Sequence, residues 1–359
     1  MRWDEQRVEN DLRLPGVGAG TVIRTFDAPE AMGINFHEVR ARSALNHVPG
    51  SRYGFSWTIN PFRGCSHACN FCFARRTHKY LDFDAGRDFE REIVVKVNVP
   101  ELLQAELGRP SWKRELVALG TNTDPYQWVE SRYRMMPEIL EALEAAETPV
   151  SVLTKSPLVL RDVEIFERMA KKLPVSVNLS VPTLDEEAWR ATEPHTPSPA
   201  ARLDAVEELR SRGIDSGVLI APLMPGINDD PAQVQPIIDR AKAAGATFLG
   251  GVALHLKDEV KDVFFGWLAA KRPDLLPRYE ALYGDRAYMR PKQRRHATRA
   301  IKGWGRGRAR RSPANSSESR PSAQSEPRAG GAGAGDPEHP AQGSPNSPRR
   351  VPPAQPSLF

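Results

Sequence analysis

All three cysteines of the chain fall within one eight-residue window, and this feature constrains the fold and chemistry most strongly. They are Cys65, Cys69 and Cys72, in a Cys-x3-Cys-x2-Cys spacing just after the first predicted strand. An odd number of cysteines packed this tightly cannot form a disulfide framework. The spacing therefore indicates a metal or redox centre on a loop.

Two metal centres are compatible with this spacing. Three thiolates leave one iron of a cubane 4Fe-4S cluster without a protein ligand, so that iron can bind an external group. A structural zinc site would need a fourth protein ligand, and His67 is the only histidine inside the loop. The spacing is unlike the Cys-x2-Cys pairs of zinc ribbons, which favours the cluster over zinc. Three buried free thiols are a third, less favoured interpretation.

Short β-branched apolar runs alternate with amphipathic segments of helical length from Thr58 onward. This alternation predicts parallel strands joined by right-handed crossovers. It does not distinguish an open doubly wound sheet from a barrel. Six strands are predicted, at residues 57–60, 116–120, 149–154, 175–180, 217–221 and 247–254. The clearest predicted helices are at residues 136–147, 201–212, 231–244, 262–270 and 274–283.

The two ends of the chain differ from this central part. Residues 1–50 are predicted to be an irregular N-terminal extension in which only residues 34–39 hint at order. Residues 51–300 form the predicted core with its C-terminal helices. Residues 301–359 are rich in Arg, Pro, Ser, Gly and Ala, and this composition predicts a disordered tail.

Charge is concentrated toward the C-terminus. The chain has a formal net charge of +5, but residues 291–359 contain thirteen Lys and Arg against four Asp and Glu. A basic, flexible tail attracts polyanions such as nucleic acid, although a merely solubilising tail is an equal alternative. The first residues are charged and no apolar run reaches the about 18 residues of a spanning helix, which predicts a cytoplasmic protein without a membrane segment.

The cysteine loop resembles the cluster-binding loop of the radical S-adenosylmethionine (SAM) superfamily, which usually has an aromatic residue before the third cysteine, here Phe71. The resemblance implies an α/β fold, a partial (β/α)6 barrel, which agrees with the six predicted strands. It implies that the open iron of a 4Fe-4S cluster binds SAM. One electron, from a donor such as flavodoxin or ferredoxin, would then cleave SAM to methionine and a 5′-deoxyadenosyl radical that abstracts hydrogen from a substrate.

Segments after the later strands resemble the branch of this superfamily that contains spore photoproduct lyase. By position, the resemblance implies that Lys155 contacts SAM and that Thr123 and Ser180 line its binding site. A cation can pair with the SAM carboxylate, and a small hydroxyl can bond a ribose or carboxylate oxygen. Asp124 and His255 also follow strands and are weaker candidates for the same cavity. The resembling segments are residues 120–127, 153–156, 178–181, 193–197 and 221–229.

The resemblance departs from the lyase at the positions that move hydrogen. Asn122 stands where the lyase has its hydrogen-donating cysteine, and no cysteine lies outside the cluster loop. Phe71 and Phe73 stand where the lyase has tyrosines, and a phenyl ring cannot transfer a phenolic hydrogen. Thymine-dimer reversal by the lyase route is therefore not expected. SAM regeneration, methyl transfer and sulfur insertion stay open.

The last residues resemble the Gln-x-x-Leu-Phe peptides that dock bacterial repair proteins on the sliding clamp, with Gln355, Leu358 and Phe359 in the three positions. Together with the basic tail, this favours a nucleic-acid-related substrate in DNA repair or modification. A non-catalytic iron-sulfur protein recruited to DNA, and a radical SAM enzyme that modifies RNA or protein, are the alternatives.

Overall fold

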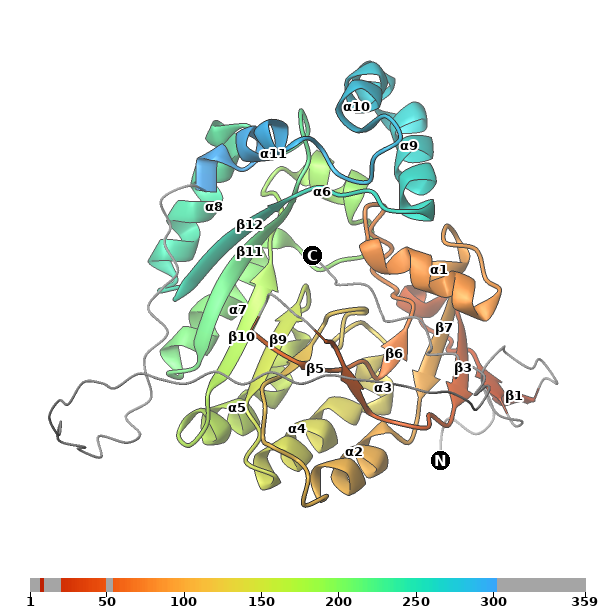
Figure 1. Ribbon diagram of the computed structural model, residues 1–359, viewed down its shortest axis with the longest axis vertical. Helices are drawn as coiled ribbons and strands as arrows, with labels where there is room; N and C mark the ends of the chain where they lie inside the picture. The colour runs from red at the N-terminus through yellow and green to blue at the C-terminus, as the bar shows by residue number, and fades with distance from the viewer. Residues whose placement is uncertain (1–6, 10–20, 50–53, 302–359) are drawn as a thin grey trace, which may run out of the picture. The chain divides into compact units, whose positions relative to one another are not determined.

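The computed structural model describes residues 7–9, 21–49 and 54–301 of the chain. Its centre is a seven-stranded sheet with the order β12-β11-β10-β9-β8-β5-β4 (Figure 1). Every neighbouring pair from β5 to β12 is parallel, whereas β4 pairs antiparallel with β5 at one edge. The strands are β4 (Leu45–His47), β5 (Trp57–Ile59), β8 (Val117–Leu119), β9 (Val150–Thr154), β10 (Val175–Ser180), β11 (Asp215–Leu223) and β12 (Phe248–Ala253).

The six parallel strands are the six that the sequence predicts, with small shifts at their ends. In-register pairing places Val117, Val150 and Val175 side by side on three neighbouring strands, and all three side chains are buried. One face of β9 and β10 is buried, and in both strands the valines on that face alternate with half-buried residues. The predicted partial (β/α)6 barrel is confirmed.

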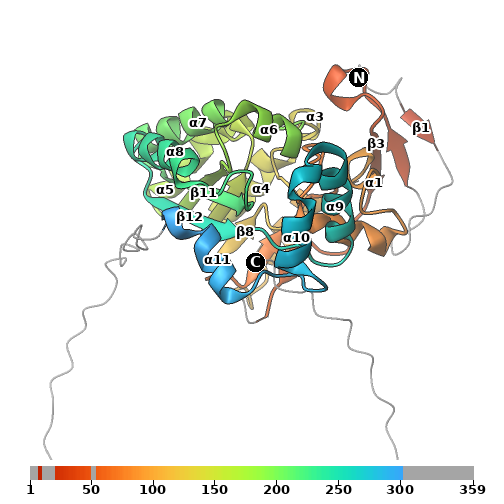
Figure 2. The same ribbon diagram turned by 90° about the horizontal axis from the view of Figure 1, so that it is seen from above.

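Helices α4, α5, α7 and α8 pack along the outside of this sheet (Figure 2). Local sequence sets where they begin: the Ser198 hydroxyl accepts the Ala201 amide at the start of α7, and a proline follows directly. Asp230 caps α8 in the same way. These helices are α4 (Met135–Ala145), α5 (Val163–Ala170), α7 (Pro199–Ser211) and α8 (Pro231–Ala243).

The C-terminal helices build a second apolar cluster around the cysteine loop. Cys69 and Phe71 pack in it with Phe264 of α9 and Tyr279 of α10. None of the helices in the described ranges is long and apolar enough to cross a membrane. The remaining helical elements are η2 (Pro29–Ala31), η3 (Phe73–Leu81), α1 (Asp88–Arg91), α2 (Val99–Leu107), α3 (Glu130–Tyr133), η4 (Pro157–Asp162), α6 (Glu186–Thr192), α9 (Glu259–Lys271), η5 (Pro273–Leu275), α10 (Leu276–Tyr283), α11 (Pro291–Ala297) and η6 (Arg299–Ile301).

A second sheet, with the order β1-β2-β3-β7-β6, contains part of the N-terminal extension. Its strand β3 coincides with the one ordered segment that the sequence indicates, and it pairs in parallel with β7. The boundaries predicted at residues 50 and 300 remain predictions, and residues 302–359 of the predicted tail lie outside the described residues. The strands are β1 (Arg7–Glu9), β2 (Val22–Arg24), β3 (Asn35–Val39), β6 (Phe62–Arg63) and β7 (Glu92–Lys96).

The turn after β8 requires glycine. Gly120 has a φ of +85°, and a Cβ there would overlap the carbonyl oxygen of Leu153 in β9. We expect Gly120→Ala to lower the free energy of unfolding by about 3 kcal/mol or more, because steric overlap adds to the backbone strain. Gly213 is the matched control, since it has a φ of +77° but open space around it. Gly213→Ala should cost about 1 to 2 kcal/mol. Urea unfolding measures both, and equal losses would contradict the steric argument.

Candidate functional site

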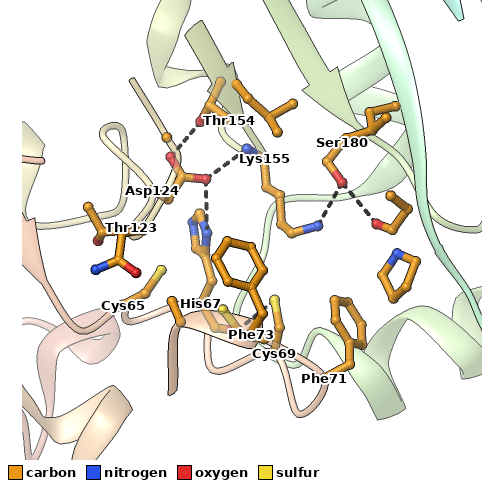
Figure 3. A pocket seen from close by; sticks show the side chains of 18 of the residues that line it. Cys65, His67, Cys69, Phe71, Phe73, Thr123, Asp124, Thr154, Lys155 and Ser180 are labelled. Atoms are coloured by element: carbon orange, nitrogen blue, oxygen red, sulfur yellow. Dashed lines mark hydrogen bonds and ion pairs between the residues drawn. The ribbon is translucent and has the colours of Figure 1, made fainter. Parts of the chain in front are cut away.

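The carboxyl ends of the parallel strands surround a cavity with about 880 Å³ of empty space, open to solvent on one side. Strands that run in parallel end at the same edge, so the loops that follow them meet there. The structure brings all six predicted site residues together in this cavity, as Figure 3 shows for most of them. They are Cys65, Cys69, Cys72, Thr123, Lys155 and Ser180. Their roles remain predictions.

The cysteine loop is held from one side by the buried guanidinium of Arg75. Its Nε donates to the carbonyl oxygen of Cys69 at 2.8 Å, and its Nη2 donates to that of Ala68 at 2.9 Å. Further bonds reach the Ala85 carbonyl at 3.1 Å and the Glu90 carboxylate at 2.7 Å. Arg75 therefore joins the loop to the segment before α1 and to α1 itself.

Gln127 and Thr123 hold the same loop from the other side. The Gln127 amide accepts the Ser66 backbone N–H at 2.9 Å and donates to the Gly64 carbonyl at 3.1 Å. The Thr123 hydroxyl donates to the same carbonyl at 2.7 Å. Thr123 lines the cavity as predicted, but its hydroxyl proton is already used to support the cysteine loop.

The three thiols fit a cluster held by one loop. Burial raises the pKa of Cys69 well above its ordinary value and that of Cys72 to about 11, so metal binding has to displace their protons. Within the described part of the chain, no three His, Cys, Asp or Glu side chains are grouped to hold a single metal ion. A cubane does not need such a group, because each thiolate binds a separate iron. The three thiols therefore fit the 4Fe-4S cluster with one open iron that the sequence predicts, and this assignment remains a prediction.

A buried ion network lies beside the thiols. The Lys155 Nζ is 2.6 Å from Glu193 Oε1 and donates to the Ser180 hydroxyl at 2.8 Å. The other carboxylate oxygen of Glu193 accepts from Arg202 at 2.8 Å, and neither Glu193 nor Arg202 is exposed. Burial acts to raise the pKa of Glu193, but the charges of Arg202 and Lys155 outweigh it and lower the pKa. Lys155 is the charged member of this network that lines the cavity, together with the Asp124 carboxylate, whereas Glu193 and Arg202 lie buried behind it.

Asp124 joins the cysteine loop to the end of β9. Its carboxylate accepts the Thr154 hydroxyl at 2.6 Å and the Lys155 backbone N–H at 2.8 Å, and it lies 3.3 Å from His67 Nδ1. It also accepts the Tyr126 backbone N–H at 2.9 Å. Asp124, a weak candidate from the sequence, therefore lines the cavity and orients two neighbouring segments.

Sequence reasoning gave no role to the residues that support the site: Arg75, Gln127, Glu193 and Arg202. One signal was available for Arg202, because it lies four and seven residues before Val206 and Leu209 on the buried face of α7. A charged residue on an apolar face of a predicted helix indicates a buried ion pair.

Comparison with known proteins gives both a family and a fold. The family model described as the Radical SAM superfamily matches residues 59–234, which include all six predicted site residues. An uncharacterized protein of Mycobacterium tuberculosis is 45% identical over 301 residues, which are 82% of this chain and 88% of that protein. An uncharacterized protein of Methanocaldococcus jannaschii is 27% identical over 198 residues, covering 55% of this chain and 70% of its own.

Two solved structures of spore photoproduct lyase resemble this chain in fold. The lyase complexed with dinucleoside spore photoproduct covers 76% of this chain and 80% of its own, with 16% identity and a TM-score of 0.57. A mutant of the same lyase with bound AdoMet and the dinucleoside covers 75% and 79%, with 14% identity and a TM-score of 0.55. At this identity the likeness shows a shared fold.

The ion network makes a testable prediction about stability. Glu193→Gln removes the charge that the buried Arg202 and the partly buried Lys155 share, and we expect it to lower the free energy of unfolding by about 3 to 5 kcal/mol. Glu186→Gln is the control. Glu186 begins α6, the helix that ends just before Glu193, and forms an exposed ion pair with Arg190 at 2.9 Å. Its cost should stay below about 1 kcal/mol. Urea unfolding of both variants measures the difference, and a Glu193 variant as stable as the control would show that the network is not needed.

Proposed function

This chain belongs to the radical SAM superfamily, and from that premise we propose that Cys65, Cys69 and Cys72 hold a 4Fe-4S cluster at which SAM is reductively cleaved. When bound, the cluster supplies the electron that converts SAM to methionine and a 5′-deoxyadenosyl radical, which abstracts hydrogen from the substrate. The observation that carries the proposal is that three thiols from one loop share a cavity with the ammonium group of Lys155. An external donor such as flavodoxin or ferredoxin would provide the electron.

Lys155 is proposed to bind the SAM carboxylate. Glu193 and Ser180 fix the position of its ammonium group, and Arg202 neutralises Glu193 from the other side. Lys155 therefore keeps a charge with which a ligand carboxylate can pair. The centre of the Phe71 ring lies 5.6 Å from the Lys155 Nζ, so an aromatic face borders this ammonium group. Ser180 and Thr123 add the small polar surface that the SAM ribose and methionine portions require.

Hydrogen transfer in this cavity is proposed to proceed without a cysteine relay. Asn122 lines the cavity at the position where the lyase has its hydrogen donor, and the chain has no cysteine outside the cluster loop. Phe71 and Phe73 line the same cavity and carry no phenolic hydrogen. The proposed reaction is hydrogen abstraction from the substrate, and the lyase's thiol-dependent return of hydrogen is not part of it.

We propose a nucleic-acid-related substrate, in DNA repair or modification. Support comes from the basic C-terminal sequence and from the clamp-like peptide at Gln355, Leu358 and Phe359, which lies outside the described residues. The spore photoproduct lyase of similar fold forms a complex with dinucleoside spore photoproduct. A cytoplasmic location stays a prediction from the sequence.

Loss of a single thiol tests the proposed function. The anaerobically reconstituted protein should bind about four irons and form 5′-deoxyadenosine when it is reduced with SAM. Cys69→Ala should lose both properties, because it removes one iron ligand. Ser66→Ala should keep both, because its buried hydroxyl has no hydrogen-bond partner among the described residues. Iron analysis and chromatography of the nucleoside product measure the outcome, and added DNA and RNA pools show which polymer changes mass.

Two results would contradict this proposal. One zinc per chain, without charge-transfer absorption after reconstitution, would assign the loop to a structural metal. A stable 4Fe-4S cluster that never cleaves SAM would indicate a non-catalytic iron-sulfur protein.

The role of Lys155 is tested separately. Lys155→Ala removes a cation but no iron ligand, so we expect SAM affinity to fall about 10- to 100-fold while the iron content stays the same. Calorimetric titration of the unreduced, reconstituted protein with SAM measures this change. Lys171→Ala, at an exposed lysine outside the cavity, is the control. Unchanged SAM affinity in the Lys155 variant would remove this residue from the proposed SAM site.

A further inference from the structure

A second hollow lies directly beside the cavity and shares a wall with it. This groove, with about 1120 Å³ of empty space, runs between the end of β12 and helix α11. Val252 and His255 line both the groove and the cavity. These two residues therefore form a wall between a ligand in the groove and the cavity.

Three aromatic rings connect the cysteine loop to the groove. Phe73 stacks on His255 with ring centroids 6.0 Å apart, and His255 stacks on Tyr288 at 5.5 Å with an interplanar angle of 17°. Backbone pairing holds the second pair in register, since residues 255 and 288 form an isolated β-bridge and Leu256 N–H donates to the Ala287 carbonyl at 2.8 Å. Phe73 directly follows Cys72, so this row of rings extends from the cysteine loop to the surface.

The outer ring is accessible and the inner ring is uncharged. Tyr288 is 40% exposed, which is unusual for a large aromatic side chain in this protein. Burial lowers the pKa of His255 to about 4, and the nearby charges of Arg76 and Lys257 act in the same direction. His255 is therefore neutral at physiological pH and stacks as an aromatic ring.

Positive charge surrounds the exposed ring. Residues 284–301 contain six Lys and Arg against a single acidic residue. The Arg294 guanidinium lies 6.0 Å from the centre of the Tyr288 ring, and Arg295 lines the same groove. Neither arginine forms an ion pair with another residue in the described part of the chain, so their charges are available to an anion.

We propose that this groove binds single-stranded DNA, with an unstacked base on Tyr288 and the flanking phosphates on Arg294 and Arg295. Every base offers a π-face, and exposed aromatic rings beside cations are the usual means of binding single strands. An acidic protein would use the arginines without needing the ring, and an apolar ligand would use the ring without needing the arginines. Presentation of the adjacent nucleotide to the cavity rests on the proposed function. Binding of the single strand in the groove does not.

Binding of labelled oligonucleotides tests this assignment. The probes are fluorescein-labelled dT12 and U12, titrated with full-length, cluster-loaded protein without SAM or reductant, and fluorescence anisotropy is read at several salt concentrations. Tyr288→Ala should weaken dT12 binding roughly 5- to 100-fold, and Tyr288→Phe, which keeps the ring, should stay within about twofold of the unmodified protein.

The arginines have a separate readout, which is the salt dependence. The double variant Arg294→Ala with Arg295→Ala should reduce the slope of log K against log salt by about 1.4, or about 0.7 for each lost phosphate contact. Tyr288→Ala should leave that slope unchanged. The control is Arg109→Ala with Lys113→Ala, which removes two exposed charges from the loop between α2 and β8, at the opposite ends of the strands. This control should keep the slope of the unmodified protein.

The outcomes separate this inference from the proposed function. Equal dT12 affinity of Tyr288→Ala and the unmodified protein would overturn the stacking site, because the basic tail is the same in both. Tighter binding of U12 than of dT12 would overturn the assignment to DNA. Protein that binds dT12 through Tyr288 but never cleaves SAM would contradict the proposed function alone. Protein that cleaves SAM but binds dT12 independently of Tyr288 would contradict this inference alone.

Discussion

The arrangement of the site depends on one buried carboxylate, that of Glu193. It lies between the cation at the end of β9 and the arginine on α7, and either cation would be uncompensated without it. The loop that carries Glu193 also contacts the cysteine loop, because the Thr192 carbonyl accepts the Asn70 backbone N–H at 3.1 Å. Glu193 Oε1 itself lies 4.0 Å from the Cys69 sulfur. The Glu193 carboxylate thus lies beside both the Lys155 ammonium group and the Cys69 thiol.

The fold was largely predictable, whereas the support of the site was not. In β9 and β10, buried valines alternate with half-buried residues, and this alternation is visible without a structure. The two-residue strand β6 is too short to show a pattern. Its pairing partner, β7, lies about thirty residues later in the chain. Arg202 lies on the apolar face of a predicted helix, but Arg75 has no such signal. The partners that bury Arg75 are loop carbonyls and Glu90, and only the three-dimensional arrangement reveals them.

The hydroxyl of Thr123 illustrates a second limit of sequence reasoning. The residue type and its place after a strand indicate a polar contact, and a polar contact exists. Its partner is the Gly64 carbonyl at 2.7 Å, so the hydroxyl supports the loop that carries the thiols. Residue type constrains what a side chain can bond, while the choice among nearby partners is a matter of packing. Similarity of fold has the same limit, since a shared barrel does not by itself transfer a reaction.

The hydrogen bonds of Arg75 and Gln127 have a consequence for how the cysteine loop is held. Both side chains bind backbone atoms of the loop, so the loop is anchored by residues other than its own cysteines. Small zinc domains behave differently, because their folding free energy is supplied by the metal. Here part of the support comes from side chains that bind no metal. The position of the loop and the number of its thiols are therefore set by different residues.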